Sequence, residues 1–301
     1  MKFGIHSLLF RETFVDRDLP LLDRCKAMGF DAVEIIPFDP EHFPAAKVKA
    51  AAADLGLTIN TGYGVPAEYN IISPDPAVRQ AGIRFSKRLI DLSNEAGAEV
   101  FAGMVYCGWG YLTGKPRTAE EWKWGVDGFR EIADYALHAS PLILGIEVVN
   151  RFESHFINVT ADAVSFIRDV GLPNVKVHLD TFHMIREEDD IARAVLTANG
   201  DLGYVHACEN QRGIPGSGLM PWKVFFQALK QVSYDGCITI ESFDPNMESI
   251  AKLCCIWRKL ADSPEQLATE GLRFLKGVYR QVYAGQPAEG VLALPTVSRS
   301  S

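Results

Sequence analysis

Residues 142–149 read LILGIEVV, a short apolar run whose single charge is Glu147 near its carboxyl end. A run of this kind is typical of a buried strand in a parallel sheet. Similar β-rich runs recur at residues 2–6, 32–36, 57–62, 100–105, 175–180, 202–207 and 237–242. Amphipathic segments separate these runs. We therefore expect eight parallel strands joined by right-handed crossovers, with helices on the outside.

The connecting segments have helical periodicity. Residues 19–29 and 75–97 carry apolar residues at spacings of three and four, and both end at glycine. Eight βα units in roughly 250 residues match the size of a closed (β/α)₈ TIM barrel. A doubly wound sheet usually has fewer strands, and no glycine-rich dinucleotide fingerprint occurs early in the chain. The sequence thus predicts an α/β protein of the TIM-barrel class.

The predicted domain organisation is simple. The chain has 301 residues, of which 48% are hydrophobic, enough for one large core. No shift in composition marks a second domain, so we expect a single barrel domain over residues 1–285. Helical periodicity is lost after that point. Residues 286–301 are therefore expected to form a C-terminal tail that is flexible or packs on a neighbour.

Net charge and cysteine content limit which binding partners and which cellular compartment we expect for the protein. A formal charge of -8 and a pI near 5.4 argue against a broad nucleic-acid-binding surface and fit a small polar substrate better. No apolar stretch reaches the roughly 20 residues that span a bilayer, and the N-terminus lacks the features of a secretory signal. The six cysteines form no C-x-x-C pair. Reduced thiols in the cytoplasm are expected, with Cys254 and Cys255 packed in the core.

Four potential metal ligands lie at or near the carboxyl ends of consecutive predicted strands: Glu147, Asp180, His206 and Glu241. Their separations are 33, 26 and 35 residues, about one βα unit each. Four neighbouring strands would therefore each direct one side chain to the same face of the barrel. That is the face where barrel enzymes have their active sites.

Three carboxylates and one imidazole form a hard, mostly oxygen-donor set that suits Mn²⁺, Co²⁺ or Mg²⁺ better than a thiolate-type zinc site would. Without a cation, the carboxylates would repel one another and raise each other's pKa. Taken singly, an Asp or Glu that ends a strand can instead cap the next helix or pair with an arginine. Four such residues, one βα unit apart, favour a divalent metal site.

The segments around these residues carry a resemblance that covers most of the barrel. The most specific are IEVVNRFE (146–153), HLDTFHM (178–184), VHACENQRGIPGSG (205–218) and IESF (240–243). With them the chain resembles the xylose-isomerase-like superfamily of sugar isomerases and epimerases. Within it, the chain is similar to the ketose 3-epimerases that act on D-tagatose, D-psicose (allulose) and L-ribulose. One departure is VHACE, where the family commonly has VHIGE, and we expect the chemistry to be unaffected.

The resemblance implies that the four residues bind a divalent metal ion, with Mn²⁺ expected before Co²⁺ or Mg²⁺. Glu147 and Glu241 would also exchange the C3 proton of a free ketose, one removing it and the other returning it from the opposite face. The expected reaction is metal-dependent C3 epimerisation through an enediolate, for pairs of the D-psicose/D-fructose, D-tagatose/D-sorbose and L-ribulose/L-xylulose type. A homodimer or homotetramer is implied in the same way.

Further side chains are expected to bind the sugar. By the resemblance, Glu153, His183 and Arg212 contact the substrate around O1 and O2, although Glu153 can equally serve to neutralise Arg212. Residues near the ends of the earlier strands are candidates to wall the distal end of the sugar, with core packing as the alternative for each: His6, Tyr63, Met104, Cys107 and Trp109.

Three alternatives stay open at this point. The first is an isomerase or epimerase of a phosphorylated sugar or of hydroxypyruvate, because the glycine-rich turn 216–218 resembles turns that hold phosphate through backbone amides. The second is a metal-dependent endonuclease on the same barrel. Such an enzyme needs many histidines for several zinc ions, so the small number here, seven, and the acidic net charge disfavour it. The third is a non-catalytic sugar-binding protein, which has no need for two carboxylates beside a metal.

Overall fold

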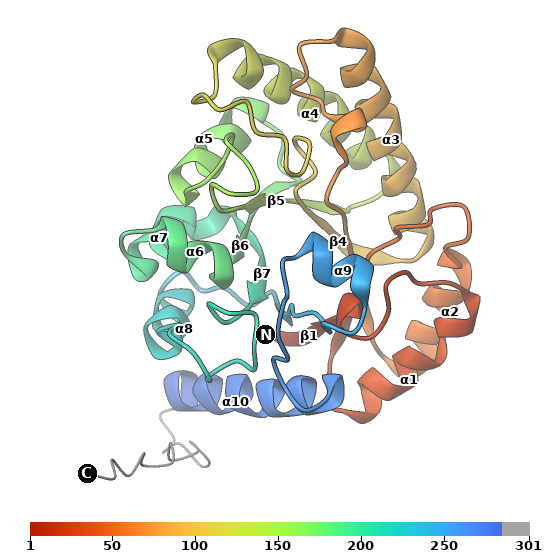
Figure 1. Ribbon diagram of the computed structural model, residues 1–301, viewed down its shortest axis with the longest axis vertical. Coiled ribbons are helices and arrows are strands. Elements are labelled where there is room, and N and C mark those ends of the chain that lie inside the picture. Colours follow the sequence, from red (N-terminus) through yellow and green to blue (C-terminus); the bar gives the residue numbers. More distant parts are fainter. Residues whose placement is uncertain (285–301) are drawn as a thin grey trace.

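A closed barrel of parallel strands forms the centre of the molecule (Figure 1). The computed structural model describes residues 1–284. Within them the strands follow one another around the barrel in chain order: β1 (Lys2–His6), β2 (Ala32–Ile35), β3 (Thr58–Gly62), β4 (Ala98–Gly103), β5 (Ile143–Val148), β6 (Val175–Asp180), β7 (Leu202–Ala207) and β8 (Cys237–Ile240). The barrel closes where β8 pairs with β1. The predicted (β/α)₈ TIM barrel is confirmed, and each strand lies within two residues of its expected bounds.

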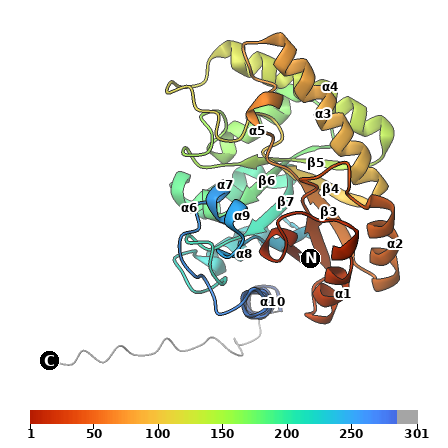
Figure 2. The same ribbon diagram turned by 45° about the vertical axis from the view of Figure 1, so that its right-hand side comes forward.

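Helices surround the strands, and Figure 2 views α10 nearly end-on beside the barrel. Their bounds are α1 (Pro20–Ala27), α2 (Ala45–Leu55), α3 (Pro76–Glu95), α4 (Ala119–Ala139), α5 (Thr160–Val170), α6 (Thr181–Glu187), α7 (Ile191–Ala198), α8 (Trp222–Gln231), α9 (Glu248–Leu253) and α10 (Pro264–Ala284). None of the helices formed by residues 1–284 combines the length and apolar character that a bilayer crossing requires. The predicted tail, residues 286–301, lies outside the described residues, so the domain boundary stays a prediction.

Local sequence signals set the helix ends. Asp75 caps α3, because its Oδ1 accepts a hydrogen bond from the Ala77 backbone N–H at 2.8 Å, and Pro76 takes the first helical position. Gly97 follows the helix with φ 72°, a left-handed conformation that glycine adopts without strain. The helix predicted over residues 75–97 is therefore present as α3, one to two residues shorter at each end.

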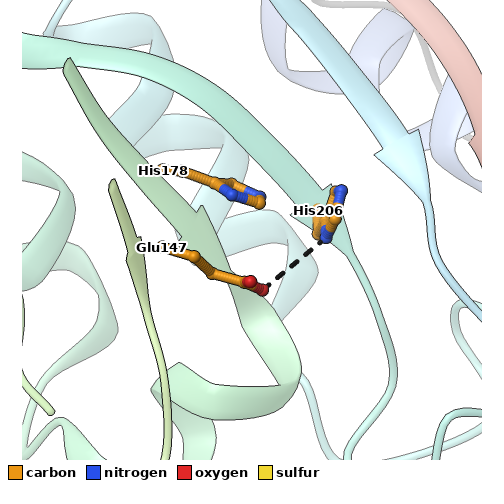
Figure 3. A group of neighbouring side chains, drawn as sticks. All are labelled: Glu147, His178 and His206. Atoms are coloured by element: carbon orange, nitrogen blue, oxygen red, sulfur yellow. Dashed lines mark ion pairs between the residues drawn. The ribbon is translucent and has the colours of Figure 1, made fainter. Parts of the chain in front are cut away.

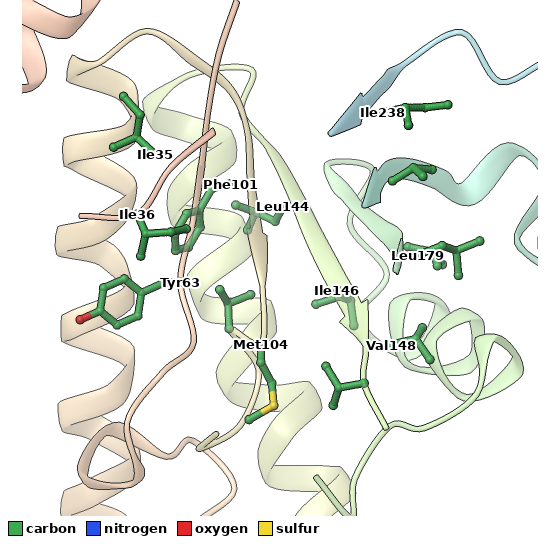
Figure 4. Packing of buried hydrophobic residues seen from close by; sticks show 14 of the residues in the cluster. Ile35, Ile36, Tyr63, Phe101, Met104, Leu144, Ile146, Val148, Leu179 and Ile238 are labelled. Atoms are coloured by element: carbon green, nitrogen blue, oxygen red, sulfur yellow. The ribbon is translucent and has the colours of Figure 1, made fainter. Parts of the chain in front are cut away.

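Strand alternation separates the apolar layer outside the barrel from the side chains that point into its interior. Leu144, Ile146 and Val148 of β5 belong to the large apolar cluster between the strands and the surrounding helices (Figure 4). The intervening positions, including Glu147, face the inside of the barrel. The same alternation in β6 sends Leu179 outward and its neighbours inward. Charged side chains therefore collect inside the barrel, at the carboxyl ends of the strands.

Candidate active site

The four predicted metal ligands converge at the carboxyl-terminal end of the barrel: Glu147, Asp180, His206 and Glu241. Each offers one ligand atom, and these atoms all lie within 4.8 Å of one another. The first three occupy inward positions on β5, β6 and β7, and Asp180 pairs directly with His206 across the sheet. Glu241 follows β8 instead of ending it. The spacing of one βα unit thus brings all four side chains to one point.

Asp180 uses its two carboxylate oxygens differently. Oδ1 accepts a hydrogen bond from the Phe182 backbone N–H at 2.7 Å and caps the start of α6. Oδ2 faces the cluster, where Arg212 Nη1 lies 2.8 Å away and His183 Nε2 lies 3.5 Å away. Helix capping and arginine pairing, the two alternatives considered from the sequence, are therefore both present. They still leave Oδ2 beside the other ligand atoms.

The Arg212 guanidinium lies among the carboxylates. Its Nη1 pairs with Glu241 as well as with Asp180, and the group stacks 3.8 Å from the centre of the Phe182 ring. The backbone of Arg212 has φ 63°, a left-handed conformation that costs free energy in an L-residue and is common where a functional loop fixes a side chain. Arg212 is thus held over the ligand cluster.

Glu153 contacts other groups and not Arg212. Its Oε2 accepts a hydrogen bond from Trp109 Nε1 at 2.9 Å, and its Oε1 accepts one from Asn150 Nδ2 at 2.8 Å. The backbone N–H of Asn150 also donates to His183 Nδ1 at 3.1 Å, which leaves the His183 proton on Nε2, toward the ligand cluster. Glu153 therefore orients Trp109, and neutralisation of Arg212 falls to Asp180 and Glu241.

A carboxylate that the sequence analysis did not single out orients His206. Glu34, on β2, is 1% exposed, and its Oε2 lies 2.7 Å from His206 Nε2 and 2.7 Å from the Tyr204 hydroxyl that donates to it. Because Nε2 donates to Glu34, the lone pair of a neutral His206 is on Nδ1, toward the cluster. Gly62 leaves room for this, since a Cβ there would lie 2.6 Å from Glu34 Oε1. The sequence feature that could have identified Glu34 is that it carries the only charge in the apolar run 32–36.

His178 is a second residue that the sequence analysis did not select. It lies on β6, two residues before Asp180, and neither ring nitrogen has a hydrogen-bond partner among residues 1–284. Its ring meets the His206 ring edge to face, with 4.2 Å between centroids, and Figure 3 shows both rings beside Glu147. Burial lowers the pKa of His178 well below its usual range, so the ring is neutral. Every second residue of a strand faces the same side, so the position two residues before Asp180 could have identified His178 from the sequence.

Burial and neighbouring charges act on the cluster in different directions. Burial, with the nearby Glu241 carboxylate, raises the pKa of Glu147 well above its usual range. Burial also opposes ionisation of Glu241, but Arg212 and His206 hold the pKa of Glu241 well below its usual range. Burial disfavours the charged form of His206, yet Glu34 and Glu241 raise the pKa of that imidazole well above its usual range. In the protein without a metal ion, the surroundings therefore favour the positively charged form of the His206 imidazole.

The donor set fits a divalent cation. His206 Nδ1 is buried without a hydrogen-bond partner in the described part of the chain, and it lies 3.8 Å from Glu147 Oε1 and 3.6 Å from Glu241 Oε2. A buried polar atom left unpaired costs about 1–3 kcal/mol, so it needs an explanation such as a ligand. The carboxylates beside it are hard oxygen donors. Charge, donor type and the bare nitrogen all suit a metal ion.

A pocket above the cluster contains the remaining candidates. Its walls include the three residues expected to contact O1 and O2, Glu153, His183 and Arg212, together with the wall candidates His6 and Trp109. Tyr63 and Met104 line it too. His6 is held by a hydrogen bond from the Leu8 backbone N–H to its Nδ1 at 3.2 Å. The polar groups lie at the ligand cluster, and aromatic side chains form much of the remaining wall.

Cys107 takes the core-packing alternative, whereas one expectation for the 254–255 pair was wrong. Cys107 does not line the pocket but is buried, with its thiol 3.5 Å from the Ser154 hydroxyl. Cys255 is exposed and has φ 56°, so the core packing expected for the 254–255 pair fails there. Its neighbour Cys254 is half-buried and lines the pocket. The apolar run containing both residues ends with α9 at the barrel mouth, which is why the pair leaves the core.

Comparison with known proteins agrees with this architecture. A sequence family described as Xylose isomerase-like TIM barrel matches residues 22–278, which defines the class of protein. An L-ribulose 3-epimerase from Methylomonas sp. (strain DH-1) is 34% identical over 83% of this chain and 88% of its own length. A D-psicose 3-epimerase from Agrobacterium fabrum (strain C58 / ATCC 33970) is 34% identical over 87% of this chain and 91% of its own.

Structural similarity leads to the same family. The crystal structure of a D-allulose 3-epimerase from Methylomonas sp. in complex with D-allulose has a TM-score of 0.88 to this chain at 31% identity, covering 93% of this chain and 97% of that one. This chain belongs to the ketose 3-epimerase family of the xylose isomerase-like TIM barrels, a family of isomerases. The resemblance predicted from the motifs is confirmed.

Proposed function

We propose that this chain catalyses the metal-dependent C3 epimerisation of free ketoses. The observation that carries the proposal is the pair Glu147, on β5, and Glu241, just after β8, whose carboxylates both approach His206 Nδ1 in the pocket. Inversion at a carbon needs one group to remove a proton and another to return it from the opposite side. The names of the related 3-epimerases support the same reaction.

Each polar group has a task in this proposal. Glu147 and Glu241 remove and return the C3 proton, in an order set by the direction of the reaction. Together with Asp180 and His206, these two residues would hold a divalent cation, which would supply Lewis-acid stabilisation of negative charge on the substrate oxygens. Mn²⁺ is the metal we propose first, with Co²⁺ or Mg²⁺ as alternatives, because the donors are mostly carboxylate oxygens.

Three side chains are proposed to orient the ketose at O1 and O2. His183 presents the N–H of Nε2 to the site, because its Nδ1 accepts from Asn150. Arg212 lies across the cluster with its guanidinium N–H groups available as donors. Glu153, fixed by Trp109 and Asn150, offers a carboxylate acceptor to a sugar hydroxyl. His6 and Trp109 would then wall the distal end of the sugar.

The turn after β7 argues against a phosphorylated substrate. Glu209 fills this turn with its own carboxylate, which accepts hydrogen bonds from the backbone N–H groups of Gly216 at 2.6 Å and Met220 at 3.3 Å. The Leu219 N–H donates to Asn210 Oδ1 at 2.9 Å. The Gly216 amide of the glycine-rich turn and the amides of Leu219 and Met220 just after it are therefore already paired within the chain. A free sugar is the better substrate, and the endonuclease and sugar-binding alternatives have no comparable support.

Location and assembly complete the proposal. All six cysteines are free thiols, which supports a cytoplasmic location. The homodimer or homotetramer stays a prediction of the family resemblance.

The test is exchange at C3. Metal-loaded protein in D₂O with D-psicose, D-fructose, D-tagatose and L-ribulose, followed by NMR, is expected to incorporate deuterium at C3 and to form the C3 epimer. The phosphorylated forms of the same ketoses are expected to react far more slowly. Exchange only with the phosphorylated sugars would move the assignment to the first alternative. Binding without any exchange would leave a sugar-binding protein.

Glu34→Gln is expected to weaken Mn²⁺ binding by about 10- to 100-fold, the usual effect of removing a carboxylate that orients a metal-binding histidine. The amide keeps the volume of the side chain but removes the charge that holds the His206 proton on Nε2. Titration of the metal-free protein with Mn²⁺, followed by calorimetry, measures the affinity directly and independently of turnover.

Glu121→Gln is the matched control. Glu121 is also a buried carboxylate paired with a histidine, with its Oε1 3.2 Å from His155 Nε2, but this pair lies outside the pocket. Its substitution should leave Mn²⁺ affinity unchanged. Equal affinities in the Glu34→Gln and wild-type proteins would contradict the orienting role of Glu34.

A further inference from the structure

A second, outer chamber adjoins the sugar pocket. Phe38, Tyr63, Trp109 and Phe182 line both spaces, so the two share these walls. The outer chamber has a volume of about 690 Å³, which lies within the range of pockets for ligands much larger than a ketohexose. A monosaccharide held at the ligand cluster would leave most of this chamber unfilled.

The outer walls are apolar where they meet solvent. Phe152 is 74% exposed and Leu253 is 46% exposed, although both line the chamber. Large apolar side chains grouped in this way at the rim of a site mark a binding surface. Among the polar wall residues are Asn150 and Arg186, whose guanidinium stacks 3.6 Å from the centre of the Phe182 ring. Aromatic faces and a few hydrogen-bonding groups therefore surround the chamber.

The aromatic walls shared by the two spaces are held in place before any ligand binds. The Trp109 indole is fixed by its hydrogen bond to Glu153, and Phe182 lies between the guanidinium groups of Arg186 and Arg212. Side chains that are already ordered lose little entropy on binding. The chamber is thus a preformed surface of the type that packs against the C–H faces of a sugar.

We infer that the outer chamber is a subsite for a second sugar unit, and that the substrates of this chain include ketoses that carry a glycosyl group on O6. The inference rests on the proposed function. The polar groups of the inner pocket hold the end of the ketose that contains C1 to C3, so its far end is directed to the outer chamber. A glycosyl group on O6 leaves the C2 ketone and the C3 hydrogen free to react.

The test compares D-fructose with 6-O-α-D-glucopyranosyl-D-fructose. With metal-loaded protein in D₂O, both are expected to exchange the C3 hydrogen, and the glycosylated ketose is expected to have a kcat/KM at least equal to that of D-fructose. Exchange with D-fructose but not with the glycosylated ketose would overturn the subsite and leave the proposed function intact. Absence of exchange with both would overturn the proposed function, and the subsite with it.

Phe152→Ala tests the outer chamber independently of the inner pocket. It is expected to raise KM for the glycosylated ketose about fivefold to tenfold, the range expected from losing one aromatic contact, and to leave D-fructose kinetics unchanged. Leu219→Ala is the matched control, because Leu219 is 75% exposed but does not line the chamber. Circular dichroism verifies that each variant folds. An equal change for both substrates, or no change for the glycosylated one, would exclude Phe152 from a glycosyl subsite.

Discussion

Glu147→Gln and Glu241→Gln are each expected to lower the rate of C3 proton exchange by about 10²- to 10⁴-fold, the range for loss of a general acid or base. Glutamine keeps the shape of the side chain and a potential oxygen ligand but cannot accept the proton. Both carboxylates lie within 4 Å of His206 Nδ1, and neither variant should disturb the barrel, because glutamine has nearly the same size as glutamate. Deuterium incorporation at C3 measures the loss directly.

Glu147→Gln should not lower the stability of the metal-free protein, although it lowers activity. Burial and the Glu241 carboxylate raise the pKa of Glu147, which means that its charged form is disfavoured in the folded, metal-free protein. An uncharged amide removes that unfavourable charge. The melting temperature measured in EDTA should therefore equal or exceed that of the wild type.

Glu131→Gln is a suitable control for both variants, because Glu131 on α4 forms an exposed ion pair with Lys87 on α3, and such pairs contribute little. It should leave exchange and stability near wild-type values. Near-normal exchange in either Glu147→Gln or Glu241→Gln would rule out the two-base mechanism.

Removing divalent cations is expected to lower turnover by at least about 10³-fold, because Lewis-acid stabilisation contributes several kcal/mol and each 1.36 kcal/mol is tenfold in rate. Activity after EDTA treatment should return on addition of Mn²⁺. The ion should also stabilise the fold, by about 2.7 kcal/mol when it is present at 100 times its Kd. Thermal unfolding with and without Mn²⁺ measures this effect.

Asp180→Asn tests whether the stabilisation comes from this site. The amide oxygen can still cap α6 by accepting from Phe182, while the charge beside the other ligands is lost. The variant should fold but should lose most of the Mn²⁺-dependent shift in melting temperature. Full activity of the chelated wild-type enzyme, or an undiminished shift in Asp180→Asn, would contradict the metal site.

The strands and the four-residue cluster could be predicted because each depends on local patterns. Apolar runs set the strands, and the regular βα spacing placed Glu147, Asp180, His206 and Glu241 on one face without knowledge of any contact. Strand alternation then decided that these side chains point inward. Helix ends were similarly local, since caps and glycines lie within a few residues of each boundary.

Contacts between distant elements were not predictable in this way. Glu34 meets His206 across the barrel, 172 residues apart in the chain, and in the sequence it is only one charge in an apolar strand. The partner of Glu153 depends on where the loop after β4 places Trp109. The exposure of Cys255 depends on where α9 ends. Each is set by three-dimensional packing that no short segment encodes.

The carboxylate of Glu209 in the turn after β7 limits how this barrel can change its substrate. It accepts from the Trp222 indole N–H at 2.6 Å as well as from two backbone amides, so the turn is built around an internal anion. Adding lysines nearby would not create a phosphate site while that anion is present. Loss of Glu209 would free the amides but leave buried donors unpaired, at about 1–3 kcal/mol each. A change toward phosphorylated sugars therefore begins with a less stable protein.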